Sequence, residues 1–134
     1  MNKPDIKNRE DIFRMVSVFY SKVSQHELLG PIFNSSISDW NAHLKHLTTF
    51  WESSLFMDTK YLGNPLDVHV KIDKVNENSI TQEHFGQWLN LWVATIDEHF
   101  EGEVANRAKT RARKMASFIY IAIFQARQEL KDKA

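Results

Sequence analysis

Histidine is the residue type in this chain most able to do chemistry, because a neutral imidazole can ligate a metal and can exchange a proton near neutral pH. The chain has six histidines and no cysteine. Without cysteine there can be no disulfide framework, iron-sulfur cluster, thiol nucleophile or zinc site with cysteine ligands. A bound metal would therefore have nitrogen or oxygen ligands.

The spacing of the histidines excludes two common metal motifs. No histidine follows a glutamate by three residues, as in di-iron carboxylate bundles, and there is no His-Glu-x-x-His motif. His43 and His46 form an H-x-x-H pair that could hold part of a zinc site, but spacing indicates no third ligand. His69 stands in a short segment of its own, where spacing alone favours a partly exposed surface histidine.

Aromatic residues are the other unusual component of the chain, with nine Phe, four Trp and three Tyr. This number fits either an enclosed flat ligand or a core that is simply rich in aromatic side chains. Tyr20 and Trp88 each combine an apolar ring with a polar tip. Composition and spacing leave both residues open to a plain interpretation, as core residues whose polar tips bond to the backbone.

The elements that position these residues are predicted to be helices within one domain, residues 1–134, of 15.7 kDa. The first helix is expected to begin after Asn8, which can cap it with Asp11, and to end before Gly30 and Pro31. Ile32 and Phe33 are expected to form an apolar corner. A second helix should follow Ser38 and Asp39 and run to about residue 57.

The second half of the chain is predicted to hold a short helix and two long ones. The stretch 58–65 is expected to be a loop, 66–71 the short helix that carries His69, and 73–79 irregular. Ser79 or Thr81 can cap the next helix, which Gly102 closes, and the last helix should span about 103–130. No segment alternates as a strand does, so the chain is predicted to be all-α.

Charge and hydropathy limit the partners of the chain. Seventeen basic residues balance seventeen acidic ones, which argues against a nucleic-acid partner. The N-terminal stretch, MNKPDIKNRED, is polar where a signal peptide is apolar, and no stretch has the length needed to cross a bilayer. We therefore expect a soluble, cytoplasmic protein with no membrane partner.

Seven short segments of the chain resemble, in sequence and in order, segments of one protein family. The segments are FYSKV at 19–23, LLGPIFN at 28–34, DWNAHL at 39–44, FW at 50–51, YLGNPLDVH at 61–69, HFGQWLNLW at 84–92 and TIDEHFEG at 95–102. In this order they resemble the third group of truncated haemoglobins, from near Ile12 to the middle of the last helix. The resemblance implies a globin-like, two-over-two helical sandwich around one haem b (iron protoporphyrin IX).

The resemblance also implies roles for individual residues. His69 matches the proximal iron ligand, and haem iron that binds a gas needs one strong axial imidazole and an open sixth position. Tyr20 and Trp88 match the distal tyrosine and tryptophan of the family. His43 matches a distal histidine that could touch the ligand and gate its access. The short turn between Asn34 and Asp39 is a departure from the family, and His84 has no expected function.

The family resemblance further implies an apolar wall around the porphyrin, which would exclude water and slow oxidation of the ferrous iron. The wall residues are Phe33, Leu47, Phe50, Trp51, Leu66, Val70 and Phe85, with Trp92 and Ile119 as further members. Trp40 is expected to be a packing anchor at a helix start rather than a haem contact.

The implied function is binding of oxygen, nitric oxide and carbon monoxide at five-coordinate iron, because Tyr20 and Trp88 can donate hydrogen bonds to a polar ligand. Two donors favour tight binding that serves nitric oxide detoxification, peroxidase-like redox chemistry or sensing, with an external reductase as electron source. Whether the chain is an enzyme, a nitric oxide dioxygenase for example, stays open at this point. Reversible oxygen storage without turnover is the alternative, and a cofactor-free helical interaction module is a remote one.

Overall fold

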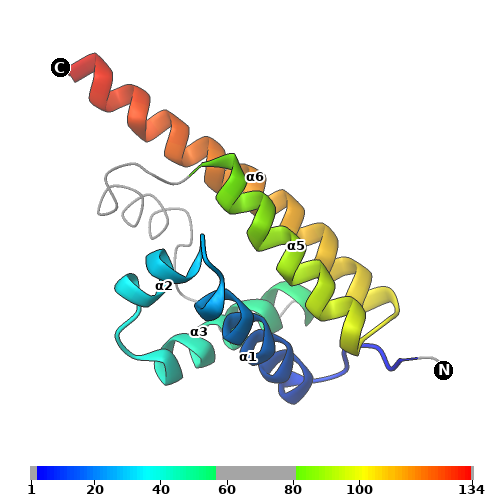
Figure 1. The fold of residues 1–134 in the computed structure, drawn as a ribbon. Helices are drawn as coiled ribbons and strands as arrows, with labels where there is room; N and C mark the ends of the chain where they lie inside the picture. The colour runs from blue at the N-terminus through cyan, green and yellow to red at the C-terminus, as the bar shows by residue number, and fades with distance from the viewer. Residues whose placement is uncertain (1–2, 57–80, 134) are drawn as a thin grey trace.

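The architecture was analysed in a computed structural model, which describes residues 3–56 and 81–133, the last stretch 127–133 as backbone only. All regular secondary structure in these ranges is helical, which confirms the all-α prediction (Figure 1). The helices are α1 (Arg9–Gln25), α2 (Gly30–Ser36), α3 (Trp40–Phe56), α5 (Gln82–His99) and α6 (Glu103–Lys133). The predicted loop 58–65, short helix 66–71 and irregular stretch 73–79 lie outside the described residues.

Helix α1 begins where its cap predicts. The backbone amide of Asp11 donates to Oδ1 of Asn8 at 2.9 Å, which satisfies one of the amides that a helix start leaves without a partner. Glu10 and Asp11 place negative charge in the first turn, where the helix dipole favours it. Its apolar residues at helical spacing, Ile12, Val16, Phe19 and Val23, are fully buried.

Helix α2 is an element that the sequence analysis missed, since a corner was expected at Ile32 and Phe33. Helix α1 ends at Gln25, before Gly30 and Pro31 as expected, but these two residues begin α2, because proline is tolerated in a first turn, where its missing N–H costs nothing. A Cβ atom on Gly30 would lie 2.7 Å from the backbone oxygen of Ser24. Glycine therefore lets α2 pack closely against the end of α1.

The starts of α3 and α5 are set by local caps. Oδ1 of Asp39 accepts the backbone amide of Ala42 at 3.1 Å, as the predicted cap requires. At the start of α5 the backbone amide of Thr81 donates to Nδ1 of His84 at 3.0 Å, which is one half of a capping box. His84, for which the sequence suggested no function, thus has a structural role in this cap.

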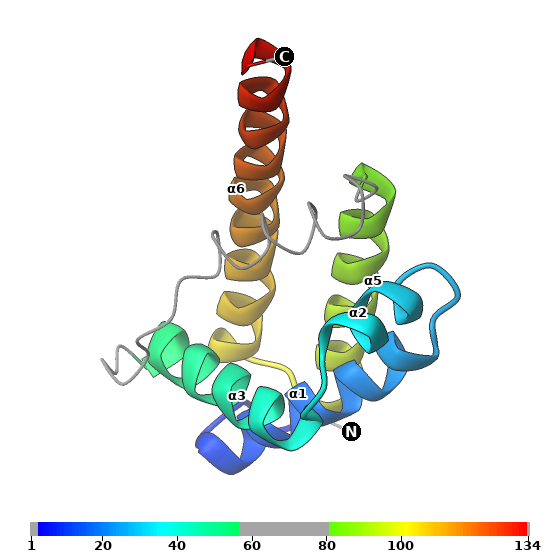
Figure 2. The ribbon, with the colours of Figure 1, turned by 90° about the vertical axis from the view of Figure 1, so that its left-hand side faces the viewer.

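The helices form two crossing layers. Helix α1 packs against α3 on one side and α5 on the other, α5 packs along α6, and α3 touches α6. Figure 2 shows α5 and α6 standing on the pair formed by α1 and α3. The main core lies where these helices meet, around Met15, Phe19, Trp92, Ile96 and Ala108. The C-terminal part of α6 projects beyond the other helices (Figure 1).

The N-terminal segment caps the start of α6. Oδ2 and Oδ1 of Asp5 accept the backbone amides of Val104 at 3.0 Å and Ala105 at 2.9 Å. Burial raises the pKa of this carboxyl group, but hydrogen bonds from backbone amides outweigh it, so the net pKa is lowered. Gly102 has φ of 136°, and a Cβ there would lie 2.6 Å from Asp5. A residue distant in sequence therefore caps the last helix.

No helix in the part of the chain that the structure describes combines the length and the apolar character needed to cross a membrane.

Candidate functional site

Three helices bring together the three side chains that the sequence predicts to face a ligand. Tyr20 comes from α1, His43 from α3 and Trp88 from α5. The rings of Tyr20 and His43 lie 5.6 Å apart between centroids, edge to face at 86°. The Trp88 side chain lies near enough to Tyr20 to lower the pKa of its hydroxyl as a hydrogen-bond donor. The prediction that these residues face a ligand stays a prediction, but their meeting in space is an observation.

The hydroxyl of Tyr20 is held in its protonated form. The residue is only 7% exposed, and burial raises the pKa of the phenol because it penalises the phenolate. The hydrogen bond with the Trp88 side chain lowers the pKa and offsets part of this rise. Tyr20 therefore presents a neutral hydroxyl, which can both donate and accept a hydrogen bond, at any physiological pH.

Two further aromatic residues border these three side chains. Phe33 on α2 lies 5.8 Å from the ring of Tyr20, and Trp40 at the start of α3 lies 6.0 Å from it. Trp40 also meets His43 edge to face at 6.0 Å. From the sequence, Trp40 was expected only to anchor the start of its helix by packing, so its position beside Tyr20 and His43 was not predicted. Its position three residues before His43 is the signal that could have indicated it. We refer to Tyr20, Phe33, Trp40, His43 and Trp88 as the Tyr20 cluster.

Two indoles lie behind the Tyr20 cluster in the core. Trp88 and Trp92 are parallel within 4° at 6.1 Å, and Trp92 stacks on Trp51 at 4.6 Å. Nε1 of Trp92 donates to the carbonyl oxygen of Ala108 on α6 at 3.2 Å. Trp51 and Trp92 are both buried in the core, where Trp92 packs against Trp88 of the Tyr20 cluster. Their predicted contact with a cofactor remains a prediction.

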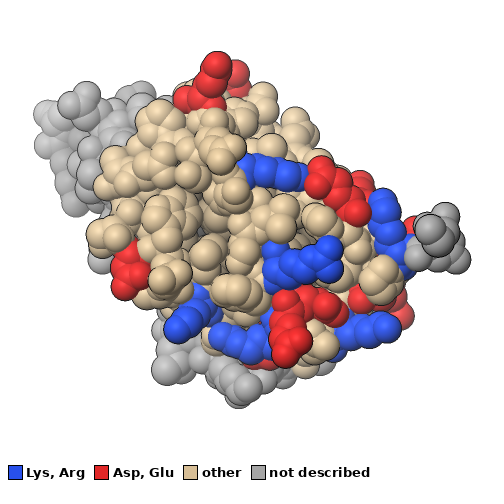
Figure 3. All heavy atoms as spheres, turned by 60° about the horizontal axis from the view of Figure 1, so that its bottom comes forward, with Lys and Arg blue, Asp and Glu red and all other residues tan. Residues whose placement is uncertain are grey.

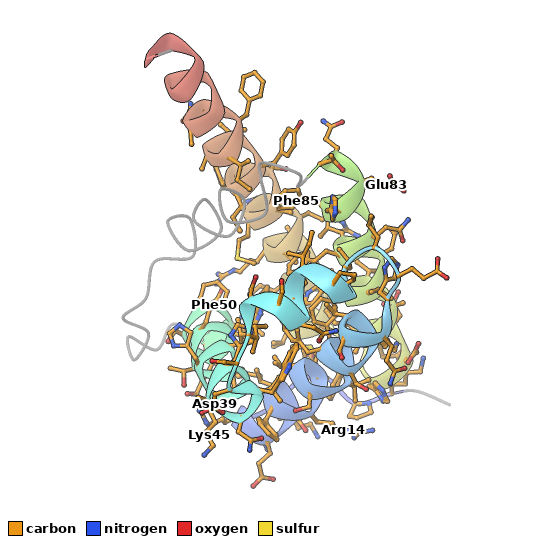
Figure 4. The ribbon with its side chains drawn as sticks, turned by 60° about the vertical axis from the view of Figure 1, so that its left-hand side comes forward. Arg14, Asp39, Lys45, Phe50, Glu83 and Phe85 are labelled. Atoms are coloured by element: carbon orange, nitrogen blue, oxygen red, sulfur yellow. The ribbon has the colours of Figure 1, made fainter. Side chains whose placement is uncertain are left out.

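The other predicted wall residues in the described ranges are partly or fully buried apolar side chains on α3, α5 and α6. Leu47 and Phe50 pack against the main core, whereas Phe85 and the buried Ile119 belong to a second, smaller cluster. Phe85 also meets Tyr120 on α6 at 5.7 Å. Figure 4 shows Phe50 on α3 and Phe85 near the start of α5. Arg14, Asp39 and Lys45 lie at the opposite, lower side of that view.

An open pocket of about 340 Å³ lies between α3 and α6. Its lining is apolar except for a serine and two cations, and consists of Phe50, Trp51, Ser54, Arg111, Lys114, Met115 and Phe118. Nη1 of Arg111 bonds to Oγ of Ser54 at 3.1 Å, which joins the two helices. Phe50 and Trp51 are predicted wall residues, so the pocket reaches the edge of the predicted cofactor site.

The predicted metal ligand, His69, and the wall residues Leu66 and Val70 lie outside the described residues. Within 3–56 and 81–133, no group of three or more His, Asp or Glu side chains is arranged to hold a metal ion. The H-x-x-H pair of His43 and His46 therefore gains no third ligand from this part of the chain. That finding does not bear on a metal held by one protein ligand and a macrocycle, as in haem proteins.

Comparison with known proteins points to one family. The group 3 truncated haemoglobin ctb of Campylobacter jejuni is 32% identical to this chain over 114 residues, which is 82% of this chain and 86% of the relative. The crystal structure of the group III truncated haemoglobin from Campylobacter jejuni superposes with a TM-score of 0.77 at 30% identity. The superposition covers 87% of this chain and 91% of that one. No protein-family model matches the chain.

Proposed function

Because the chain belongs to the group 3 truncated haemoglobins, we propose that it is a haem protein that binds diatomic gases, with His69 as the axial ligand of the iron. The observation that carries the proposal is the Tyr20 cluster, in which a phenol, an indole and an imidazole meet around the buried Tyr20 side chain in an aromatic setting. Such a combination of an apolar lining with a few convergent polar groups is typical of a ligand site.

The residues of the described helices fit such a cofactor. A porphyrin is a flat apolar ring, and the predicted wall offers aromatic and aliphatic side chains from α2, α3, α5 and α6. Bound haem would supply an iron with one open axial position for oxygen, nitric oxide or carbon monoxide. The protein would contribute the apolar lining that excludes water, provided by Phe33, Leu47, Phe50, Trp51, Phe85, Trp92 and Ile119, together with Leu66 and Val70.

The role of Tyr20 follows from its protonation state. A phenol whose pKa is raised by burial keeps its proton, so its hydroxyl can donate to a polar ligand. The indole N–H of Trp88 is a donor only, and bonded to Tyr20 it orients the hydroxyl or shares the ligand with it. His43, edge-on to Tyr20, is placed to contact the ligand or to gate its access.

The number of donors favours tight binding over transport. A hydrogen bond to a charged acceptor contributes roughly 1.5 to 3 kcal/mol, which corresponds to about ten- to a hundredfold slower ligand release per donor. Two donors would make release too slow for ordinary oxygen delivery. We therefore propose nitric oxide detoxification, peroxidase-like redox chemistry or sensing, supported by an external reductase in the cytoplasm, with haem b as the cofactor.

The visible spectrum of the purified protein tests the proposal. We expect an intense absorption band near 400 nm, as a bound porphyrin gives, which shifts on reduction with dithionite and again on addition of carbon monoxide. Protein that takes up no pigment, even after haem is added, would exclude a haem function. Pigmented protein that binds oxygen but does not consume nitric oxide in the presence of a reductant would favour oxygen storage instead.

A further inference from the structure

The pocket between α3 and α6 has a cationic rim that the proposed gas site does not use. Arg111 and Lys114 on α6 line this pocket beside Phe50 and Ser54 of α3. Phe118, one turn further along α6, completes the lining on that side. We refer to the surface formed by these five residues as the α3–α6 face. Phe50, a partly exposed residue of the predicted haem wall, lies on this surface.

Some basic side chains of the described residues elsewhere are paired with carboxylates. Arg9 pairs with Glu52, Lys22 with Glu98 and Lys109 with Asp97. On the face shown in Figure 3, acidic and basic side chains likewise lie next to one another.

By contrast, within the described residues neither Arg111 nor Lys114 pairs with a carboxylate, and Arg111 bonds instead to the neutral hydroxyl of Ser54. The described side chains that line this pocket therefore include two cations and no carboxylate.

Exposed apolar side chains continue the same surface along α6. Arg111, Lys114, Phe118 and Ile121 follow one another at spacings of three and four residues, so they share one side of the helix. Phe118 is 64% exposed and Ile121 is 50% exposed. Exposed large apolar side chains next to cations mark an interaction surface. Arginine, methionine and aromatic residues are the types enriched where proteins meet.

We propose that the α3–α6 face docks an acidic protein that donates electrons to the haem. The proposal rests on the proposed function, because Phe50 and Trp51 belong both to the pocket and to the predicted haem wall. In the step itself, the reduced donor loses one electron and the ferric iron gains it, and no atoms are transferred. A donor seated on this face would lie beside Phe50 and Trp51 of the predicted haem wall, with its carboxylates near Arg111 and Lys114.

A second copy of this chain fits the α3–α6 face less well than an acidic partner. Two copies that met through this face would bring like charges together, which disfavours association. The α3–α6 face is also small, five residues that line one pocket, whereas a stable interface has about 20 to 30 residues on each partner. A small, charged surface of this kind is suited to a transient electron-transfer complex.

Binding of a defined acidic donor tests the proposal without depending on haem chemistry. The probe is a small, strongly acidic flavodoxin in its oxidised form, titrated with the protein while flavin fluorescence anisotropy is recorded. We expect Lys114→Glu to weaken binding by roughly tenfold at low ionic strength, because a charge on the interface rim acts mainly through steering. The difference should nearly vanish at about 0.5 M salt, where exposed charges are screened.

Matched variants separate docking from folding. Lys45→Glu makes the same charge change on an exposed lysine of α3 that does not line the pocket, and it should leave binding unchanged within twofold. Lys114→Gln removes the charge without reversing it and should fall between wild type and Lys114→Glu. Equal weakening by Lys45→Glu and Lys114→Glu would overturn the proposal, because it would show only an effect of net charge.

A second readout distinguishes failure of docking from failure of the proposed function. The rate at which reduced flavodoxin shifts the band near 400 nm should fall in Lys114→Glu, whereas the rate with the small reductant dithionite should not. Protein without pigment would refute the haem function while leaving the binding titration to decide about the surface. Lys114-dependent binding to vesicles of anionic phospholipid, with no binding to flavodoxin, would overturn the docking proposal in favour of a membrane surface.

Discussion

At the scale of the residue, the hydroxyl of Tyr20 is the feature on which ligand chemistry would depend. Burial raises the pKa of the Tyr20 phenol, and hydrogen bonding by the Trp88 side chain offsets part of that rise. The sequence indicated Tyr20, His43 and Trp88 through a family resemblance, and they do meet. It could not indicate Trp40 as part of the cluster, because a tryptophan at a helix start has an equally good explanation as a packing anchor.

Replacement of the Tyr20 hydroxyl should weaken ligand retention. We expect Tyr20→Phe to release oxygen about ten- to a hundredfold faster, since it removes one hydrogen bond to a charged acceptor, with little change for apolar carbon monoxide. Stopped-flow displacement measures both rates. Tyr120→Phe deletes the same atom outside the Tyr20 cluster and should leave the oxygen rate unchanged. An unchanged oxygen rate in Tyr20→Phe as well would remove Tyr20 from the ligand site.

At the scale of the element, helix starts were predictable and long-range caps were not. Asn8, Asp39 and Thr81 stand beside the helices that they begin, so local spacing indicates them. Helix α2 was missed because Gly30 and Pro31 were taken only as the end of α1, although the same proline is also suited to a first turn. Asp5 caps a helix that begins 98 residues later in the chain (103 − 5), a distance at which sequence spacing carries no information.

The close approach of α1 and α2 at Gly30 predicts a steric cost for any side chain there. A Cβ atom would lie 2.7 Å from the backbone oxygen of Ser24, so Gly30→Ala should lower the free energy of unfolding by about 1 to 3 kcal/mol. Gly86→Ala is the matched control, because no atom lies within 4 Å of its Cβ position on α5. Helix propensity predicts that Gly86→Ala raises the free energy of unfolding by about 0.5 to 1 kcal/mol. Urea denaturation measures both, and equal effects would contradict the packing argument.

The Asp5 cap predicts a pH-dependent contribution to stability. Loss of a carboxylate cap costs about 1 to 2 kcal/mol, so Asp5→Ala should unfold more readily than wild type at neutral pH. The pKa of Asp5 is lowered in the folded protein from its ordinary 3.8. Its contribution is therefore fully present above that value and is lost as the pH falls through the folded-state pKa.

Urea denaturation from pH 7 down to pH 3 measures this effect of Asp5→Ala. The difference from wild type should stay constant at first and shrink in the acid range. Glu101→Ala, an exposed change at the same corner, should stay within about 0.5 kcal/mol of wild type throughout. A difference for Asp5→Ala that grows as the pH falls would contradict the assignment of its carboxylate as the cap.

At the scale of the whole molecule, the site exists only because helices far apart in sequence meet. Tyr20, His43 and Trp88 lie on three helices, and the predicted wall is divided between two apolar clusters. Periodicity indicated the buried face of α1 but not that of α3, where Thr48 and Leu55 are buried, and it could not indicate which faces meet, because packing depends on the crossing of whole helices. Family resemblance supplied that information, and the TM-score of 0.77 against a truncated haemoglobin agrees with it. The surface charge at Arg111 and Lys114 was not predictable, since it depends on which carboxylates lie nearby.

The proposed function depends on ligation of the haem iron by His69, which resonance Raman spectroscopy of the ferrous protein detects through the iron–histidine bond itself. We expect an iron–histidine stretching band in wild type and its loss in His69→Ala. The band should persist in His46→Ala, which replaces an exposed histidine of α3. Added imidazole should restore a band of this kind in His69→Ala. An iron–histidine band that persists in His69→Ala without imidazole would contradict the account.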